Sequence, residues 1–137
     1  MLGDKVGELQ GQVTGQRYLP QVDGQPKMEV TFTTTGTLLG VSVTYSGTYW
    51  SIIRPDGSLY GECPWQGVIM THDGVVGTWG AAGVGKFTNP QGAVSWRGAI
   101  YFQIPSGPLT ALNQVAVVFE WAVDAQGKAT GLLWAWQ

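Results

Sequence analysis

The stretch GAAGVGKFT, from Gly80 to Thr88, comes close to a phosphate-binding loop. Such a loop reads G-x-x-x-x-G-K-[ST], and Gly80, Gly85 and Lys86 stand at the matching positions. Phe87, however, replaces the hydroxyl residue that would bind magnesium, and the Asn-Pro that follows cannot begin the required helix. We therefore interpret the glycines as part of a curved β-strand, where glycine marks a bend or a close approach. No nucleotide cofactor is expected.

The single histidine and the single cysteine offer little further chemistry. His72 lies in the predicted turn THDG, where a side chain is usually solvated. Cys63 precedes Pro64 inside an expected strand, which predicts a bulge because proline cannot donate to a ladder. The thiol is either a small buried side chain or a reactive group at a pocket mouth. One His and one Cys cannot build an ordinary zinc site, so no metal and no cofactor are predicted.

Glu120 is the one candidate for a catalytic carboxylate. It stands between Phe119 and Trp121 in the most apolar stretch, VAVVFEWAV. If its side chain faces a dry cavity, it could act as a general acid or base. If it faces outward, it is either a lone charge or a structural ion pair with Arg97 on the preceding strand. These three alternatives remain open at this point.

The aromatic residues are the larger signal, because the chain holds seven tryptophans. Small residues alternate with Trp79, which suggests recesses beside its ring. We predict one aromatic wall and one recessed wall around a ligand, with Glu120, Arg97 or a tyrosine such as Tyr101 meeting a polar end. The predicted ligand-binding residues are Trp79, Ala81, Gly83, Arg97, Tyr101, Phe119, Trp121, Trp134 and Trp136. The alternative is that the aromatic residues fill a core and form contacts between subunits.

Composition limits the partners of the chain. Its 137 residues form one domain, 1–137, and its net charge of -2 argues against nucleic acid. Only 12% of the residues are charged, so we expect apolar outer surface and a homo-oligomer, most simply a dimer. The sequence contains no run of about 18 apolar residues, so no membrane helix is predicted. With no signal-peptide pattern at its start, the expected location is the cytoplasm and no membrane partner is expected.

Strand-like stretches alternate with turn signals along the whole chain. Asp-Gly and Pro-Asp-Gly turns separate them, and only the connection 105–113 suggests a short helical turn. We predict an all-β protein, a single closed antiparallel up-and-down barrel of about eight strands, because tight turns favour a meander and closure removes the edges. The expected strands cover residues 7–19, 27–40, 41–54, 59–71, 75–88, 93–104, 114–123 and 129–137.

Three stretches, RPDGSLYGE with GVIMTHDG, GAVSWRGAIYFQ, and VFEWAVDAQGKATG, resemble those of small uncharacterised prokaryotic proteins with an allene oxide cyclase-like barrel. The resemblance spans nearly the whole chain. It implies an eight-stranded barrel of the calycin type and implies no activity. No catalytic position of the plant cyclases is matched here.

Three functions fit these observations. The first is a barrel that binds a small apolar or aromatic molecule, because the mouth of a small barrel is a usual ligand site. The second is a cyclase- or isomerase-like enzyme that uses a shaped apolar cavity, with Glu120 as its one candidate catalyst. The third is a structural or assembly protein with a filled barrel. The size and lining of the interior distinguish the first two from the third.

Overall fold

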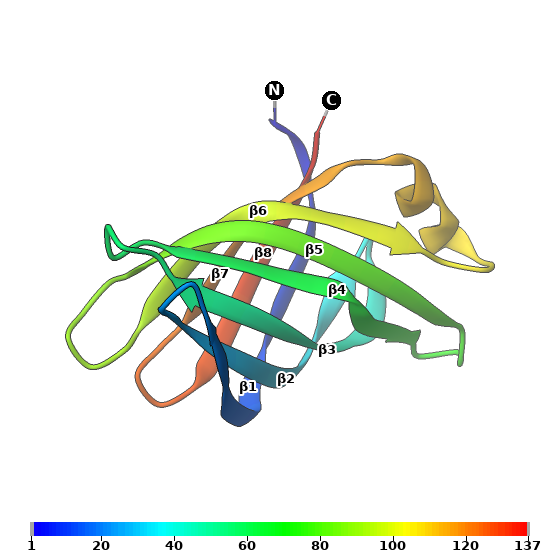
Figure 1. Ribbon diagram of the computed structural model, residues 1–137. Coiled ribbons are helices and arrows are strands. Elements are labelled where there is room, and N and C mark those ends of the chain that lie inside the picture. Colours follow the sequence, from blue (N-terminus) through cyan, green and yellow to red (C-terminus); the bar gives the residue numbers. More distant parts are fainter. Residues whose placement is uncertain (1, 137) are drawn as a thin grey trace.

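The computed structural model describes residues 2–136 and confirms the predicted all-β, closed, eight-stranded antiparallel up-and-down barrel (Figure 1). Each strand pairs with its neighbours in the sequence. The barrel is closed by pairing of the first strand with the last, from Leu2 opposite Trp136 to Gln12 opposite Lys128. The strands are β1 (Leu2–Val22), β2 (Gln25–Leu38), β3 (Val41–Ile53), β4 (Leu59–Thr71), β5 (Val76–Phe87), β6 (Val94–Gln103), β7 (Val117–Val123) and β8 (Lys128–Trp136).

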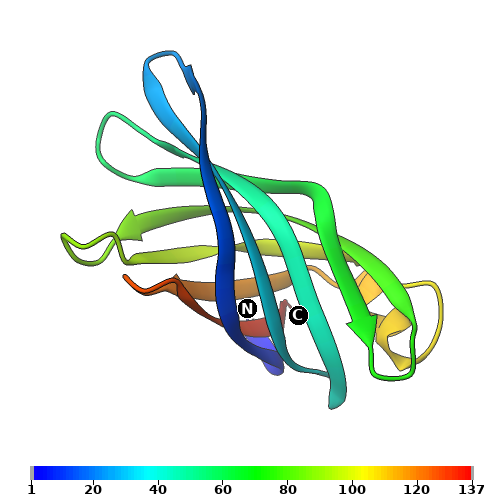
Figure 2. The same cartoon turned by 90° about the horizontal axis from the view of Figure 1, so that it is seen from below.

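The first strand is longer than predicted, because its pairing with β8 continues beyond the expected start at residue 7. It also extends past β8 at the other end, where its partner is β2 alone. The β1–β2 hairpin therefore projects from the rest of the barrel (Figure 2). Its two-residue turn has positive φ at Asp23 (51°) and Gly24 (77°), as a type I′ hairpin turn requires.

The near-match to a phosphate-binding loop lies within a regular strand. Residues 76–87 form β5, and Phe87 is its last residue. The side chain of Lys86 is exposed to solvent. The interpretation of this stretch as a strand is confirmed.

A bulge interrupts the pairing of β4 with β5, as the Cys63-Pro64 dipeptide predicts. The register shifts between Cys63 and Gly67, and Trp65 within the bulge has a φ of 54°. The Trp65 side chain lies outside, against Gly80 of β5. The bulge thus turns one tryptophan away from the interior.

One end of the barrel is closed by the β6–β7 connection. The predicted short helical turn at 105–113 is confirmed as the 3₁₀ helix η1 (Pro108–Gln114). Its Leu109 and Leu112 are 1% and 2% exposed and belong to the hydrophobic core. The Asn113 side chain fixes the connection by accepting a hydrogen bond from Ile104 N (2.7 Å) and donating one to Ile104 O (2.9 Å). Both chain ends lie near this end of the barrel (Figure 1).

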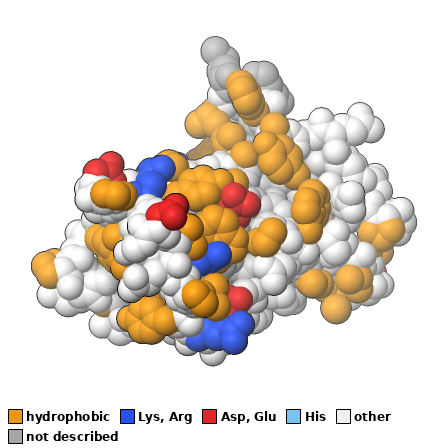
Figure 3. Space-filling view, viewed as in Figure 1, with side chains coloured by type: hydrophobic (Ala, Val, Ile, Leu, Met, Phe, Trp, Pro, Cys, Tyr) orange, Lys and Arg blue, Asp and Glu red, His pale blue; other side chains and the backbone are white. Residues whose placement is uncertain are grey.

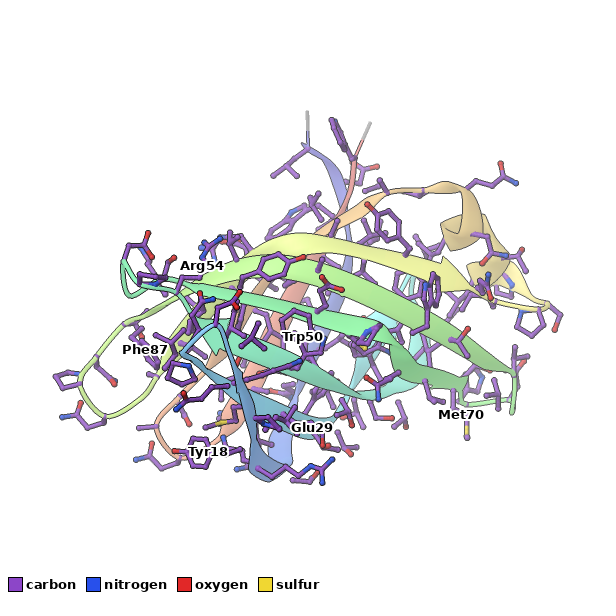
Figure 4. All side chains as sticks on the ribbon, viewed as in Figure 1. Tyr18, Glu29, Trp50, Arg54, Met70 and Phe87 are labelled. Carbon is purple, nitrogen blue, oxygen red and sulfur yellow. The ribbon has the colours of Figure 1, made fainter. Side chains whose placement is uncertain are left out.

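The opposite end holds four turns and no helix among the described residues. These turns join β1 to β2, β3 to β4, β5 to β6, and β7 to β8. Figure 4 labels Phe87 and Arg54 at this end and Met70 toward the other. Below, the end with η1 is called the closed end and the end with the four turns the open end.

No helix in residues 2–136 has the length and apolar character needed to cross a membrane.

Candidate functional site

Aromatic rings fill the middle of the barrel. The rings of Tyr45 and Trp79 are stacked, with centroids 4.3 Å apart and an interplanar angle of 11°. The Phe32 ring packs on that of Trp121 at 4.8 Å and on that of Trp79 at 6.0 Å. These four rings come from β2, β3, β5 and β7 and so join opposite walls of the barrel.

Each inward-facing tryptophan lies over glycines of other strands. A methyl group at Gly47 would lie 2.7 Å from Trp79 Cζ2, and one at Gly85 would lie 2.8 Å from Trp96 Cδ2. Trp121 covers Gly131 in the same way, at 2.6 Å. The rings occupy the space that larger side chains would take. This pairing of large and small residues explains several strand glycines, including Gly85 in the near-match to a phosphate-binding loop. Others, such as Gly11, Gly36 and Gly98, lie against the backbone of the neighbouring strand.

A small apolar cavity remains between these rings and the wall formed by β4, β5 and β6. Its volume is about 60 Å³. It is smaller than the roughly 150 Å³ cavity that accepts benzene in another protein. We name it the inner cavity. Its lining residues are Phe32, Tyr45, Tyr49, Gly61, Glu62, Cys63, Trp79, Ala81, Ala82, Gly83, Trp96, Ile100, Phe119 and Trp121.

A second and larger cavity, of about 290 Å³, occupies the open end. We name it the mouth. Apolar side chains of the barrel wall line it, including Val30, Leu59, Val94 and Val123. Polar residues from the strand ends and turns also contribute; they are Gln16, Tyr18, Lys27, Ser51, Gln91 and Asp124. Phe87, labelled in Figure 4, is half-exposed and also borders the mouth.

Tyr49 and Trp96 line both the mouth and the inner cavity. Their rings meet edge to face, with centroids 5.9 Å apart and an interplanar angle of 78°. They form the boundary between the two cavities. A molecule that enters the mouth reaches this pair before it reaches the aromatic cluster.

Buried titratable groups near the inner cavity are neutral at physiological pH. Burial raises the pKa of Cys63 to about 11, and it raises the pKa values of Tyr45 and Tyr49 well above the ordinary tyrosine value. Cys63 is 3% exposed. The reading of Cys63 as a small buried side chain is therefore favoured over a reactive thiol, since the thiolate is the nucleophilic form.

Five of the predicted ligand-binding residues line the inner cavity. They are Trp79, Ala81, Gly83, Phe119 and Trp121. The expected recess at Gly83 is absent, because a methyl group there would lie 2.7 Å from the Arg97 carbonyl oxygen and 3.2 Å from Phe119 Cζ. Gly83 is a point of close strand approach rather than empty space.

The other four predicted residues lie on the outer face. Tyr101 and Trp136 are 52% and 60% exposed. Trp134 alternates with the buried Leu133 and Ala135, so its side chain points away from the interior. The prediction that the tryptophans of β8 face the lumen is wrong, because Leu133 and Ala135 occupy the inner positions of that strand.

Glu120 also lies on the outer face. Its Oε1 forms an ion pair with Arg97 Nη2 at 2.9 Å, and both side chains are substantially exposed. Of the three alternatives for Glu120, the structure supports the ion pair with Arg97. Glu62 is the carboxylate that borders the inner cavity, and its Oε2 accepts a hydrogen bond of 2.6 Å from the Tyr60 hydroxyl.

Sequence reasoning missed four important rings of the interior: Phe32, Tyr45, Tyr49 and Trp96. The alternation of β2 contains a signal for Phe32, which shares a face with the apolar Val30. Tyr45 and Tyr49 share a face with Val43 in the same way. Trp96 alternates in step with Ile100 and Phe102 on β6, opposite the face that carries Arg97, so alternation contains a signal for Trp96 as well.

Among residues 2–136, no group of three or more His, Cys, Asp or Glu side chains is placed to hold a metal ion.

No family model matches the sequence, and no curated protein matches it. Solved structures do match over nearly the full chain. A conserved protein of unknown function from Rhodopseudomonas palustris has a TM-score of 0.80 at 15% identity, covering 99% of each chain. A protein of unknown function from Clostridium acetobutylicum has a TM-score of 0.80 at 13% identity, covering 99% of this chain and 100% of that one.

A beta-barrel like protein from Acinetobacter baumannii also has a TM-score of 0.80, at 12% identity, and covers 99% of this chain and 96% of that one. At these identities the likeness concerns the fold alone. The chain is thus similar in structure to prokaryotic β-barrel proteins of unknown function.

Proposed function

We propose that this protein binds one small, flat, largely apolar molecule at the open end of the barrel. The observation that carries the proposal is the mouth, a cavity of about 290 Å³ that narrows to the aromatic pair Tyr49 and Trp96. Small-molecule sites are concave and mostly apolar, and the mouths of β-barrels are among their usual places. This proposal refines the predicted site, because the ligand body lies in the mouth and only its inner end approaches the inner cavity.

The proposed binding function agrees with a calycin-type, allene oxide cyclase-like barrel, which the sequence resemblance implies. Support for the cyclase- or isomerase-like alternative is weaker. Its candidate catalyst, Glu120, is engaged with Arg97 on the outer face. Glu62 is bound to the Tyr60 hydroxyl. We therefore favour binding without chemistry.

A dye titration tests the proposed function. N-phenyl-1-naphthylamine is neutral and apolar, and its fluorescence rises in an apolar site. We expect saturation at one dye per chain. Val94→Phe should abolish this binding by filling the mouth, while changing the free energy of unfolding by less than about 2 kcal/mol, because the mouth has room for the ring. Ala122→Phe, on the exposed face of the neighbouring strand β7, is the matched control and should bind dye normally.

Loose, non-saturating fluorescence would contradict the proposal. Equal dye binding by Val94→Phe and the wild type would contradict it as well, because it would place the dye outside the mouth.

A second candidate, an assembly role, is favoured by the apolar outer surface. Val68, Met70 and Val76 of β4 and β5 are between 42% and 49% exposed. Figure 3 shows separate hydrophobic patches over the right-hand part of β4 and β5 with no charged group between them, while the charged groups of this face lie at the centre and left. We propose a dimer through this surface. Light scattering at tens of micromolar should give twice the 14.7 kDa chain mass, and Val76→Lys should restore the single chain. A single chain for the wild type would contradict the dimer.

A further inference from the structure

The indole nitrogen of Trp96 is the unusual polar atom of the interior. Trp96 is 6% exposed, and its Nε1 has no hydrogen-bond partner among the described residues. Buried N–H groups are nearly always paired, because an unpaired one loses its water without compensation. Another buried indole, that of Trp79, follows this rule, since its Nε1 donates to Ser46 O at 3.1 Å.

The position of this indole is fixed by its neighbours. The ring lies over Gly61 of β4 and Gly85 of β5, where added methyl groups would lie 3.0 Å from Cη2 and 2.8 Å from Cδ2. The indole therefore has little freedom to turn its N–H toward a protein acceptor. The indole ring also lines both the mouth and the inner cavity, while its Nε1 has almost no exposed surface of its own. A ligand acceptor therefore reaches the N–H by displacing a neighbouring side chain.

A second neutral donor lies beside it. Burial raises the pKa of Tyr49, so its hydroxyl stays protonated, while the Trp96 N–H, which approaches the Tyr49 oxygen, lowers that pKa by a smaller amount. The two groups meet edge to face without a hydrogen bond of normal geometry.

The charges around this pair indicate which acceptor fits. No Lys or Arg lines the inner cavity. The one cation that borders the mouth, Lys27, has its Nζ 4.6 Å from the centroid of the Trp50 ring. An anion at the Trp96–Tyr49 boundary would lose its hydration without a counter-charge, which is costly. A neutral acceptor avoids that cost.

We propose that the ligand carries a neutral carbonyl-type acceptor at its inner end, which accepts a hydrogen bond from Trp96 Nε1. Its apolar body lies in the mouth against Val30, Leu59, Val94 and Val123. This inference rests on the proposed function. The Trp96 N–H favours ligands that carry such an acceptor. Tyr49 is the second donor at the same boundary.

The test uses two probes of nearly the same shape, acetophenone and ethylbenzene, of which only the first has a carbonyl oxygen. Each is titrated against the full chain, with displacement of N-phenyl-1-naphthylamine as the readout. The ratio of their Kd values is then compared between wild type and Trp96→Phe. Taking this ratio cancels the different hydration of the two probes. Trp134→Phe, on the outer face of β8, is the control for the same substitution elsewhere.

In Trp96→Phe we expect acetophenone to lose about tenfold in affinity, as for one hydrogen bond, while ethylbenzene changes by less than about threefold. Tyr49→Phe keeps its ring and should show a smaller loss with the same probe selectivity. In the wild type, the Trp96 indole N–H proton should move downfield in nuclear magnetic resonance spectra when acetophenone binds, and not when ethylbenzene binds. The resonance is assigned by its absence from the spectrum of Trp96→Phe.

The outcomes separate this inference from the proposed function. If both probes displace the dye but Trp96→Phe weakens them equally and the indole proton does not move, the acceptor is wrong and the binding function stands. If neither probe nor the dye binds in the mouth, both are overturned. Selective loss of acetophenone together with the downfield shift supports both.

Discussion

The two ends of the barrel differ in how the chain closes them. At the closed end, η1 places Leu109 and Leu112 in the core, and Asn113 fixes the connection through two hydrogen bonds to Ile104. At the open end, short turns join the strands and leave the mouth of about 290 Å³ between the walls. The difference lies in the length of the connections, since only the β6–β7 connection is long enough to fold back over the barrel. One end thus supplies stability and the other leaves room for a ligand.

The largest expected effect is at the closed end. Leu112→Ala removes a fully buried side chain and should lower the free energy of unfolding by about 2–5 kcal/mol, as for other buried leucines. Phe87→Ala is the comparison at the open end. It removes a half-exposed ring and should cost less than about 1 kcal/mol. Urea denaturation with a two-state fit measures both. Equal losses of unfolding free energy in the two variants would contradict the difference between the ends, because the open end would then be packed as tightly as the closed end.

Cys63 lies between the two ends and reports on access to the interior. Burial raises its pKa to about 11, from an ordinary value of 9.0, so folding favours the protonated thiol. This contribution to stability is fully present below about pH 9 and is lost as the pH rises toward 11. Alkylation by iodoacetamide at pH 8 should therefore be much slower than in the urea-unfolded chain. A native rate close to the unfolded one would show that the interior is wet and open.

The smallest effect on stability is expected for substitutions on the outer face of the barrel, away from both ends. The Arg97–Glu120 ion pair is exposed, and exposed pairs contribute about 0–1 kcal/mol. A double-mutant cycle with Arg97→Ala and Glu120→Gln should give a coupling in that range that decreases with added salt. Dye binding should be unchanged in both variants. If Glu120→Gln abolished binding while leaving stability intact, the outer face would belong to the functional site.

Much of the fold could be predicted because local signals and global topology agree. Turn signals such as Pro55-Asp56-Gly57 separate the strands, and closure follows from their number and tight connections. The inward direction of Trp79 and Trp121 also followed from alternation. Trp134 and Trp136 were misplaced because LLWAW is apolar at every position, so alternation cannot show which face of β8 is inside.

The site itself was harder to predict, because it depends on register between strands. Bulges shift the pairing between Val13 and Gly15, between Gly47 and Trp50, and between Cys63 and Gly67. Each shift changes which residues lie opposite one another. Only the shift after Cys63 has a sequence signal, the proline at position 64, and no comparable signal marks the other two. The placement of Trp96 over Gly61 and Gly85, and its edge-to-face contact with Tyr49, therefore became visible only in the structure.

The most direct test of the account locates the ligand within the barrel. Methyl nuclear magnetic resonance spectra are recorded while the wild-type chain is titrated with N-phenyl-1-naphthylamine. We predict shifts for Val30, Leu59, Val94 and Val123, which line the mouth, and none for Leu38, Leu109 and Leu112 near the closed end. Shifts confined to the closed end, or to Val68 and Val76 on the outer face, would contradict a ligand site at the open end.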